Sequence, residues 1–375
     1  MALGPRTLRA ALCALVLAGC GSDPPPALPE HFFTINANSL VADAPLRDTH
    51  LRAIADSGAT AVRADVLWNV VENTPPAAGG RRTFDWAQTD RFVAALARAG
   101  LTWRPLLGNS PHWNRSVTGN VTSAPHDPRL AGGLATELLR RYGPGGALWT
   151  THPELEERPV RWIEAWNEPN LAPGDNGVLR YPPKGYARFL RAVADGAHEI
   201  ETGAQVIVGG LVPYPETSSR SQEVGEFLAG VARADPELPS LVDGVAVHVY
   251  DLESGVVFET LGALRERIDA TPFAGVPLHL NETGAAVTPA AGQTREAARA
   301  AYLEEIVART AGASGPACNV ASVAPYTWTT AEADPADPQH WFGIANRDAT
   351  LKPSAVAWRR GIAAAKPGDA RCTGA

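Results

Sequence analysis

Two glutamates stand out because each ends an apolar, strand-like run of the chain. Glu168 ends the run that begins at Trp162, and Glu282 ends the run that begins at Val276. Two carboxyl groups facing each other across a site are the minimal equipment for cleaving a glycosidic bond. The pair therefore predicts acid–base and nucleophilic chemistry, provided that the fold brings the two strand ends together.

Each glutamate also has a simpler explanation when it is considered alone. Asn167-Glu168-Pro169 has the composition of a helix start, with a polar residue at the cap and proline in the first turn. Glu282 alone is compatible with a solvated charge at the end of a strand. Their occurrence at matching ends of two predicted strands favours a shared site over two unrelated features.

A repeating order of strand, helix and glycine predicts the scaffold. The run from Ala59 to Val66 is apolar and rich in β-branched residues, and the helical pattern at 87–99 ends before Gly100, as helices often do. Candidate strands lie near 32–38, 60–66, 102–107, 161–166, 205–210, 243–249, 277–281 and 322–328. Candidate helices lie near 44–57, 87–99, 129–142, 184–201, 220–233, 257–269, 294–311 and 353–364.

Strands that are apolar throughout and alternate with helices predict an α/β fold of the (β/α)8 TIM-barrel type, with one catalytic domain over residues 31–366. Such barrels carry their catalytic groups at the carboxyl ends of the strands. Glu168 would end the fourth strand and Glu282 the seventh, so both would face the same mouth.

The motifs around these residues resemble those of retaining glycoside hydrolases of the large 4/7 barrel superfamily, clan A, with families 39 and 5 nearest in pattern. The matching segments are 65–72, 84–86, 162–170, 242–250 and 278–284. The resemblance covers most of residues 31–365 and implies Glu168 as general acid/base and Glu282 as nucleophile. Asn281 stands where many relatives have Thr or Ser before the nucleophile.

Further site residues are expected from their chemistry beside this pair. Arg63, at the end of the second strand, would give Glu282 a fixed positive neighbour. Tyr250 would donate its phenol to Glu282, and His248 shares that strand face because it lies two residues earlier. Asn167 would hold the sugar 2-hydroxyl, a contact that strengthens in the transition state.

Aromatic residues complete the predicted substrate site. Trp328 ends the predicted eighth strand, where the resemblance implies an aromatic floor beneath the scissile sugar. Trp113, after the third strand, and Trp341, after the eighth, are looser candidates for stacking on sugar faces.

Composition excludes several other classes of partner and cofactor. The chain has 375 residues, a formal net charge of −7 and a sequence pI near 5.8, so no basic field attracts nucleic acid. No Cys/His cluster has zinc spacing, and we expect neither a metal nor an organic cofactor. The predicted partner is a carbohydrate, and the oligomeric state is open.

The two ends of the chain predict export. Residues 1–20 have a basic start, a short apolar run and Leu17-Ala-Gly-Cys20, which resembles the lipobox of bacterial lipoproteins. We therefore expect a lipidated Cys20 that anchors the exported protein to a bacterial membrane, followed by a proline-rich tether over 21–30. Cys318 and Cys372 remain in the mature chain and predict one disulfide that pins the tail at 367–375.

Two alternatives remain open at this stage. A transglycosylase would use the same two glutamates and differ only in the acceptor. A non-catalytic glycan-binding lipoprotein would use the same scaffold, because a fold does not fix a function. The presence of both Glu168 and Glu282 speaks against the second alternative.

Overall fold

Eight parallel strands follow one another in chain order in a single sheet of the computed structural model, which describes residues 27–42, 45–76, 81–171, 181–214, 216–217 and 221–372. They are β1 (Thr34–Asn36), β2 (Ala61–Asp65), β3 (Thr102–Leu107), β4 (Trp162–Ala165), β5 (Gln205–Leu211), β6 (Gly244–Val249), β7 (Leu278–Thr283) and β8 (Val320–Pro325). A parallel bridge between Phe33 and Val323 brings β8 back to β1, so the barrel is nearly closed. The predicted (β/α)8 architecture is confirmed.

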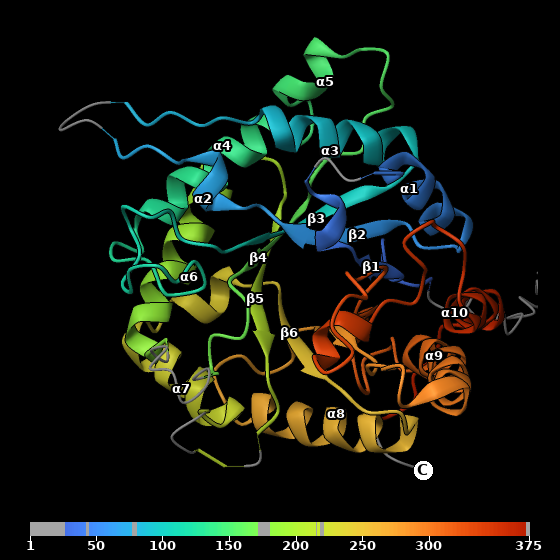
Figure 1. Cartoon of the computed structure of the whole chain (residues 1–375). Coiled ribbons are helices and arrows are strands. Elements are labelled where there is room, and N and C mark those ends of the chain that lie inside the picture. Colours follow the sequence, from blue (N-terminus) through green and yellow to red (C-terminus); the bar gives the residue numbers. More distant parts are fainter. Residues whose placement is uncertain are drawn as a thin grey trace, which may run out of the picture.

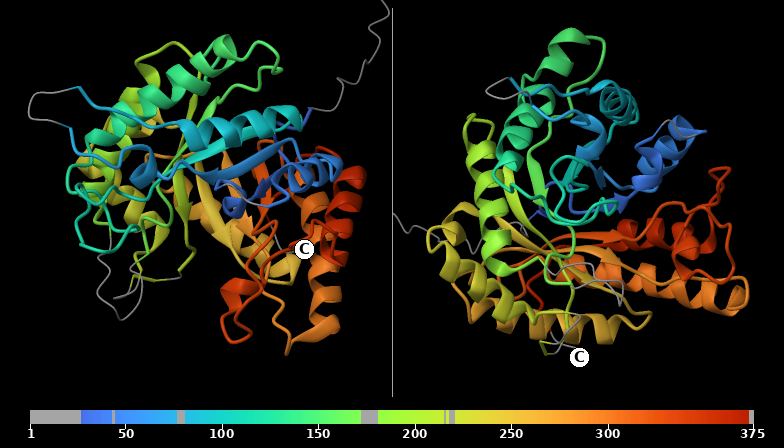
Figure 2. Two further views of the ribbon diagram at one scale, coloured as in Figure 1. Left: turned by 45° about the horizontal axis from the view of Figure 1, so that its top comes forward. Right: turned by 60° about the vertical axis from the view of Figure 1, so that its left-hand side comes forward.

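Helices surround this barrel on its outside, as Figures 1 and 2 show. Every predicted helix is present, with its ends shifted by at most a few residues. They are α1 (Arg47–Asp56), α3 (Ala87–Arg98), α4 (Leu130–Tyr142), α6 (Pro183–His198), α7 (Val224–Ala234), α8 (Ser254–Asp269), α9 (Gly292–Gly312) and α10 (Pro353–Ala364). Shorter helices α2 (Trp68–Val71) and α5 (Ala147–Thr151) and the 3-10 turns η1 (Asn38–Leu40), η2 (Leu238–Leu241) and η3 (Pro338–Trp341) lie in the connections.

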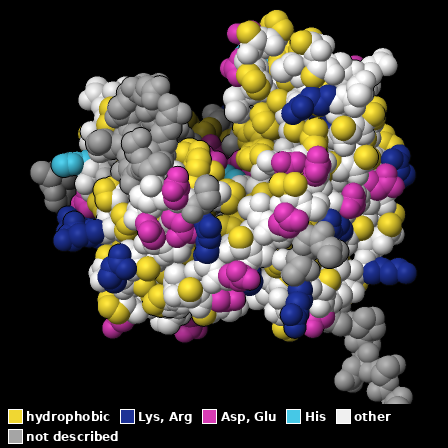
Figure 3. All heavy atoms as spheres, turned by 90° about the horizontal axis from the view of Figure 1, so that it is seen from below, with side chains coloured by type: hydrophobic (Ala, Val, Ile, Leu, Met, Phe, Trp, Pro, Cys, Tyr) yellow, Lys and Arg dark blue, Asp and Glu magenta, His cyan; other side chains and the backbone are white. Residues whose placement is uncertain are grey.

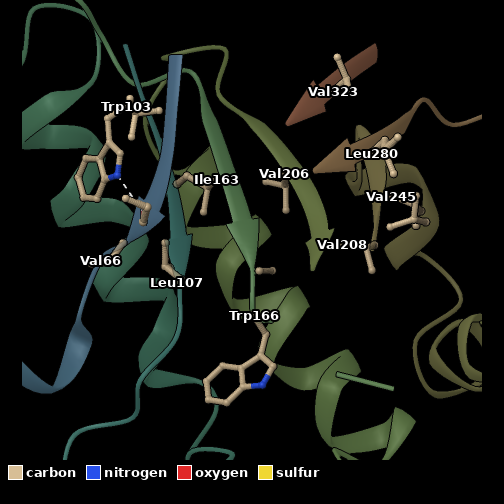
Figure 4. Packing of buried hydrophobic residues seen from close by; sticks show 14 of the residues in the cluster. Val66, Trp103, Leu107, Ile163, Trp166, Val206, Val208, Val245, Leu280 and Val323 are labelled. Carbon is tan, nitrogen blue, oxygen red and sulfur yellow. Dashed lines mark hydrogen bonds between the residues drawn. The ribbon is translucent and has the colours of Figure 1, made fainter. Parts of the chain in front are cut away.

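Alternate side chains of the strands face two different environments. Ile163, Val206 and Leu280 belong to the main apolar core, which includes the inner faces of the helices (Figure 4). Trp162, Ile207 and Ala246 form a separate, small apolar cluster. Each member of the small cluster is next in the chain to a residue of the main core. Successive side chains of a strand point to opposite faces, so we place the small cluster inside the barrel. The interior is otherwise rich in polar side chains.

Cationic and aromatic side chains pack around this small inner cluster. The Arg104 guanidinium lies 4.7 Å from the centre of the Trp162 ring, and the Trp162 and His279 rings are 5.6 Å apart. Burial lowers the pKa of Arg104 to about 10. Burial, and then the charge of Arg104, hold the pKa of His279 well below its ordinary value, so His279 is neutral in the folded protein.

This buried histidine predicts a loss of stability in acid. In the unfolded chain His279 takes up a proton near pH 6.5, whereas in the folded chain it does not. The unfolded state therefore binds more protons below that pH, and stability falls by up to about 1.4 kcal/mol per pH unit from this group. Urea unfolding at pH 7.5 and 5.5 should show a smaller acid loss for His279→Gln than for the native protein. His31 and His50, whose pKa values burial also lowers, are present in both proteins and cancel in the comparison. Equal acid losses would contradict the assignment.

The predicted disulfide joins Cys318, just before β8, to Cys372 in the C-terminal tail, with Cα atoms 5.1 Å apart. Both cysteines are buried. The tail lies against α8, because a Cβ placed on Gly262 would come within 2.1 Å of the Cys372 carbonyl oxygen. The bridge therefore holds the end of the chain to the outer layer of helices.

Reduction of this bridge should cost measurable stability. It closes a loop with a sequence separation of 54 residues. Loop closure of this size contributes about 4 kcal/mol in the chain-entropy model. We expect no reactive thiol in the denatured, unreduced mature protein, and a lower urea midpoint for Cys318→Ala/Cys372→Ala. Two labelled thiols before reduction would refute the bridge in solution.

The N-terminal predictions lie mostly outside the described residues. Residues 1–20, with Cys20, and most of the predicted tether precede residue 27. Within the described part of the tether, Leu28 packs against the main core, and Arg104 donates a hydrogen bond to the Glu30 carbonyl at 3.3 Å. No helix in the described part of the chain combines the length and the apolar character that crossing a membrane requires.

Candidate active site

The chain turns sharply after β4 and so places Glu168 in the mouth of the barrel. Trp166 and Glu168 both have positive φ, 74° and 47°, which is uncommon for residues with side chains. Such a conformation persists only where surrounding contacts hold it. Here the Trp166 ring packs edge-on against Tyr181 and Phe189, with centroids 5.5 and 5.4 Å away.

Asn170 fixes the loop that follows. It is completely buried, and its amide donates to the carbonyls of Val212 and Gln222, each at 2.9 Å, and accepts from the Val212 N–H at 3.0 Å. The loop after β4 is thereby attached to the segment after β5. The Asn-Glu-Pro-Asn sequence thus combines a candidate catalytic carboxyl with the side chain that secures its loop.

Glu282 lies near the end of β7, and each of its oxygens is already engaged. Arg63 Nη1 donates to Oε1 at 2.7 Å, and the Tyr250 hydroxyl donates to Oε2 at 2.5 Å. Burial, and then the negative charge of Glu282, raise the pKa of Tyr250 well above its ordinary value, so the phenol stays protonated. Both donors point at the carboxyl oxygens and fix their orientation in the cleft.

His248 lies between the two candidate catalytic carboxylates. Its Nδ1 atom is 2.9 Å from Glu168 Oε1 and 3.5 Å from Glu282 Oε2. Its Nε2 atom is buried and has no hydrogen-bond partner among the described residues. A neutral imidazole therefore keeps its single proton on Nδ1, where it can be donated to a carboxylate.

Two consecutive glycines in β5 make room for this arrangement. A Cβ on Gly209 would lie 1.9 Å from the Trp166 carbonyl oxygen, and one on Gly210 would lie 1.8 Å from His248 Nε2. The Gly210 N–H also donates to Glu164 Oε1 at 3.0 Å. Only glycine allows this strand to pass so close to the site.

A cleft of about 870 Å³ opens above these residues, and both candidate glutamates line it. Figure 3 shows acidic side chains in both the left and the right half of the surface that is seen from below. Tyr250, Tyr326 and Phe342 line one wall and contact one another edge-on, with ring centroids 5.4 to 6.1 Å apart. Aromatic walls of this kind suit the apolar faces of sugars.

The expected position of Trp328 requires a correction. Strand β8 ends at Pro325, so Tyr326 occupies the mouth and Trp328 lies deeper. Trp328 is completely buried, and its indole N–H donates to His50 Nδ1 at 3.0 Å. It is a core residue and does not line the cleft.

Of the other predicted binding residues, Asn167 lines the cleft but Trp113 and Trp341 do not. Asn167 lines the cleft, and its carbonyl oxygen accepts from Arg63 Nη2 at 3.0 Å. Trp113 and Trp341 are not among the residues that line the cleft, and their indoles donate to the carbonyls of Glu72 and Asp334.

Several site residues were not identified from the sequence. Asp65, on the same face of β2 as Arg63, lines the cleft and accepts from Asn109 Nδ2 at 2.9 Å. Burial raises the pKa of Asp65, and the bond from Asn109 opposes that effect. Glu164, inside β4, is completely buried and pairs with Arg63. Asp65 lies two residues after Arg63 in β2, and this spacing could have predicted that both side chains face the same way. The pairing of Glu164 with Arg63 could not be predicted in this way, because it depends on how the barrel closes.

Glu168, His248 and Glu282 are the one group among the described residues with donor atoms close enough to share a metal ion, all within 4.8 Å of one another. Arg63 and Tyr250 already donate to both oxygens of Glu282. A metal ion would have to displace these donors from Glu282. The donor set therefore fits a carboxylate held by hydrogen bonds better than a metal ligand.

No protein-family model matches the chain, and no curated protein matches it. Solved structures share its fold at low sequence identity. A monomeric β-xylosidase from Caulobacter crescentus CB15 is 23% identical, with a TM-score of 0.65, over 89% of this chain and 69% of that one. A family 39 glycoside hydrolase from Xanthomonas axonopodis pv. citri is 19% identical, with a TM-score of 0.63, over 92% and 71%. A family 5, subfamily 18 enzyme from Streptomyces cattleya, solved with GlcNAc, is 14% identical, with a TM-score of 0.62, over 90% and 80%.

The chain has the barrel fold of these glycoside hydrolases. The resemblance to families 39 and 5 that the motifs indicated is confirmed at the level of fold. The similar structures extend beyond the part that this chain matches.

Proposed function

We propose that this protein is a retaining glycoside hydrolase that acts through a covalent glycosyl-enzyme. The observation that carries the proposal is the placement of Glu168 and Glu282 in one cleft, with one oxygen of each carboxyl group within 4.8 Å of one oxygen of the other. Retaining enzymes have carboxyl groups about 5–5.5 Å apart, whereas inverting enzymes need about 6.5–9.5 Å to admit a water. The short separation supports direct attack by one carboxylate.

Differences between the two glutamates support their separate roles. The Glu282 side chain is 8% exposed and held by Arg63 and Tyr250, which suits an ionised nucleophile. The Glu168 side chain is 26% exposed and lies 2.9 Å from His248 Nδ1, and no arginine or lysine of the described residues forms an ion pair with it. This setting suits a group that exchanges protons with the leaving group and with water.

In the first step, a Glu282 oxygen forms a bond to the anomeric carbon as the bond to the leaving oxygen breaks. Glu168 gives its proton to that oxygen, so the leaving group departs as an alcohol. In the second step, Glu168 takes a proton from water while the water oxygen bonds to the anomeric carbon. The ester to Glu282 breaks and the original anomeric configuration returns.

The walls of the cleft indicate a neutral sugar at the reacting position. Tyr250, Tyr326 and Phe342 offer aromatic faces on one side. Asp65 and Asn109 offer polar atoms on the side of β2 and β3, where sugar hydroxyls would donate and accept. Asp65 and Glu282 both line this cleft, which disfavours a negative charge on a sugar beside them.

A panel of 4-nitrophenyl glycosides and polysaccharides tests the activity and names the sugar. NMR of the first-formed product should show the anomer of the substrate. An inverted first product would overturn the retaining mechanism, and absence of release from the whole panel would favour the glycan-binding alternative. Products made in the presence of competing acceptor sugars distinguish a transglycosylase from a hydrolase.

Export with a lipid anchor at Cys20 is part of the same proposal, and the disulfide supports an oxidising location. Native protein expressed in a bacterium with a lipoprotein pathway should sediment with membranes and enter the detergent phase. Cys20→Ala should leave the precursor unprocessed or release soluble protein. A native protein that stays in the soluble fraction would contradict the anchor.

A further inference from the structure

The strongest unexplained feature near the site is Glu164, which lies in β4 four residues before Glu168. Its side chain is completely buried, yet it carries a carboxyl group, which forms an ion pair with Arg63. A buried ion pair is weak evidence for stability, because desolvation offsets much of the attraction. We therefore look for the role of the Arg63–Glu164 pair in its effect on the candidate active site.

Arg63 has no free donor. A guanidinium has five N–H groups. Nε and Nη2 donate to the two oxygens of Glu164 at 2.6 and 2.8 Å, and Nη1 donates to Asn36 at 2.8 Å and Glu282 at 2.7 Å. The remaining N–H of Nη2 donates to Asn167 at 3.0 Å. The plane of the guanidinium is thus fixed, and one N–H points at the candidate nucleophile.

Both carboxyl oxygens of Glu164 likewise accept two hydrogen bonds each. Besides the two bonds from Arg63, Oε1 accepts from the Gly210 N–H at 3.0 Å and Oε2 accepts from Asn281 Nδ2 at 2.9 Å. Four donors occupy its two oxygens, and it does not line the cleft. It therefore acts on the site through the groups that it binds, and among them Arg63 is the one that donates to Glu282.

Two carboxylates consequently share one guanidinium. Burial alone would lower the pKa of Arg63, but the charge of Glu164, followed by that of Glu282, raises it, so Arg63 is cationic throughout. The negative charge of Glu164 partly cancels the field that Arg63 exerts on Glu282. Without it, Arg63 would bind the ionised Glu282 more strongly than the neutral ester.

We propose that Glu164 is a positioning residue that aims Arg63 at Glu282 and limits its positive charge there, which keeps the carboxylate reactive. This rests on the proposed glycoside hydrolase function. Loss of the charge should slow formation of the glycosyl-enzyme, because that step consumes the Glu282 anion. It should spare or accelerate breakdown of the glycosyl-enzyme, because that step restores the anion.

Other groups also face Glu282 and remain unchanged in the test. They are Asp65 from β2, Glu168 after β4, His248 and Tyr250 from β6, and Tyr326 after β8. Their contributions are common to native protein and variants, so a difference between the two pH profiles reports the substituted residue.

Glu164→Gln removes the charge with little change of shape. With the 4-nitrophenyl glycoside that the native protein cleaves best, kcat/KM should fall about 10–100-fold and kcat should fall less. The acidic limb of kcat/KM against pH should move about one unit lower, because removing a nearby negative charge favours an ionised carboxylate. A pre-steady-state burst, if the native protein shows one, should shrink.

Glu72→Gln is a matched control. Glu72 is buried and receives a two-pronged contact from Arg82 and a bond from the Trp68 indole, but it does not line the cleft. If Glu164 were merely structural, both variants would lose stability and keep the native pH profile. A native acidic limb in folded Glu164→Gln, or an equal shift in Glu72→Gln, would overturn the proposal.

Glu164→Asp covers the case in which the glutamine variant does not fold. It keeps the charge and shortens the side chain, so kcat/KM should fall while the acidic limb stays at the native pH. A downward shift of the limb in this variant would also contradict the proposal. Failure of the native protein to cleave any glycoside would instead reject the proposed function on which the inference rests.

Discussion

Glu282→Ala should abolish turnover on every substrate, whereas Glu168→Ala should retain attack on glycosides with good leaving groups. Loss of the nucleophile removes the covalent path, and the rate should fall by on the order of 10⁶-fold, as for other nucleophiles. Loss of the acid should cost about 10²–10⁴-fold with poor leaving groups and much less with 4-nitrophenolate, which needs little protonation. Both effects follow from the shared cleft and the different surroundings of the two residues.

Azide separates the two roles further. In Glu168→Ala the small anion can enter where the carboxylate stood and attack the glycosyl-enzyme without a general base. Release of 4-nitrophenol should therefore accelerate with azide in Glu168→Ala, with a glycosyl azide of retained configuration as product. Glu259→Ala, an exposed glutamate on α8, should match the native protein throughout. Near-normal activity of Glu282→Ala would reject the assignment.

Gly210→Ala should damage the site although it adds a single methyl group. The new Cβ would lie 1.8 Å from His248 Nε2, a separation that real atoms cannot adopt. The strand cannot retreat easily, because the Gly210 N–H is bonded to Glu164 and β5 pairs with β6. His248 must then move away from Glu168. Overpacking of this kind costs about 1–3 kcal/mol or more, and a displacement near 1 Å can reduce kcat about 10²-fold.

Gly312→Ala provides the control for that substitution. Gly312 ends α9, and a Cβ placed there would meet nothing within 4 Å. It should leave kcat unchanged and alter the urea midpoint little or upward. Comparable losses for the two alanine variants would show that the close approach to His248 is unimportant.

The strands were predictable because a buried parallel strand is a short apolar run between helices, and all of them lie near their expected positions. The end of β8 could not be predicted in the same way. The last strand residue is Pro325, but the sequence stays largely apolar as far as Trp328. That error placed Trp328 in the mouth, where Tyr326 lies. Aromatic identity alone did not distinguish a wall of the cleft from the core.

The candidate glutamates were identifiable because strand ends in a barrel converge, which is a property of the fold. The partners of Arg63 were harder to foresee. Its pairing with Glu164 joins β2 to β4 and skips β3, so it depends on the curvature of the closed barrel. The close passage of Gly210 beside His248 likewise depends on the local register of β5 and β6, which is irregular between Val208 and Leu211.

The positions of Phe32 and Cys372 carry a consequence for how a glycan would reach the cleft under the proposed function. Phe32 leads into the amino end of β1, and Cys372 is bridged to Cys318 just before the amino end of β8. Phe32 and Cys372 therefore lie toward the face opposite the cleft, which lies at the carboxyl ends of the strands. A protein held to a surface close to either of these two residues would turn its cleft outward. A cleft that faces away from the surface would be open to a long glycan as well as to a small glycoside.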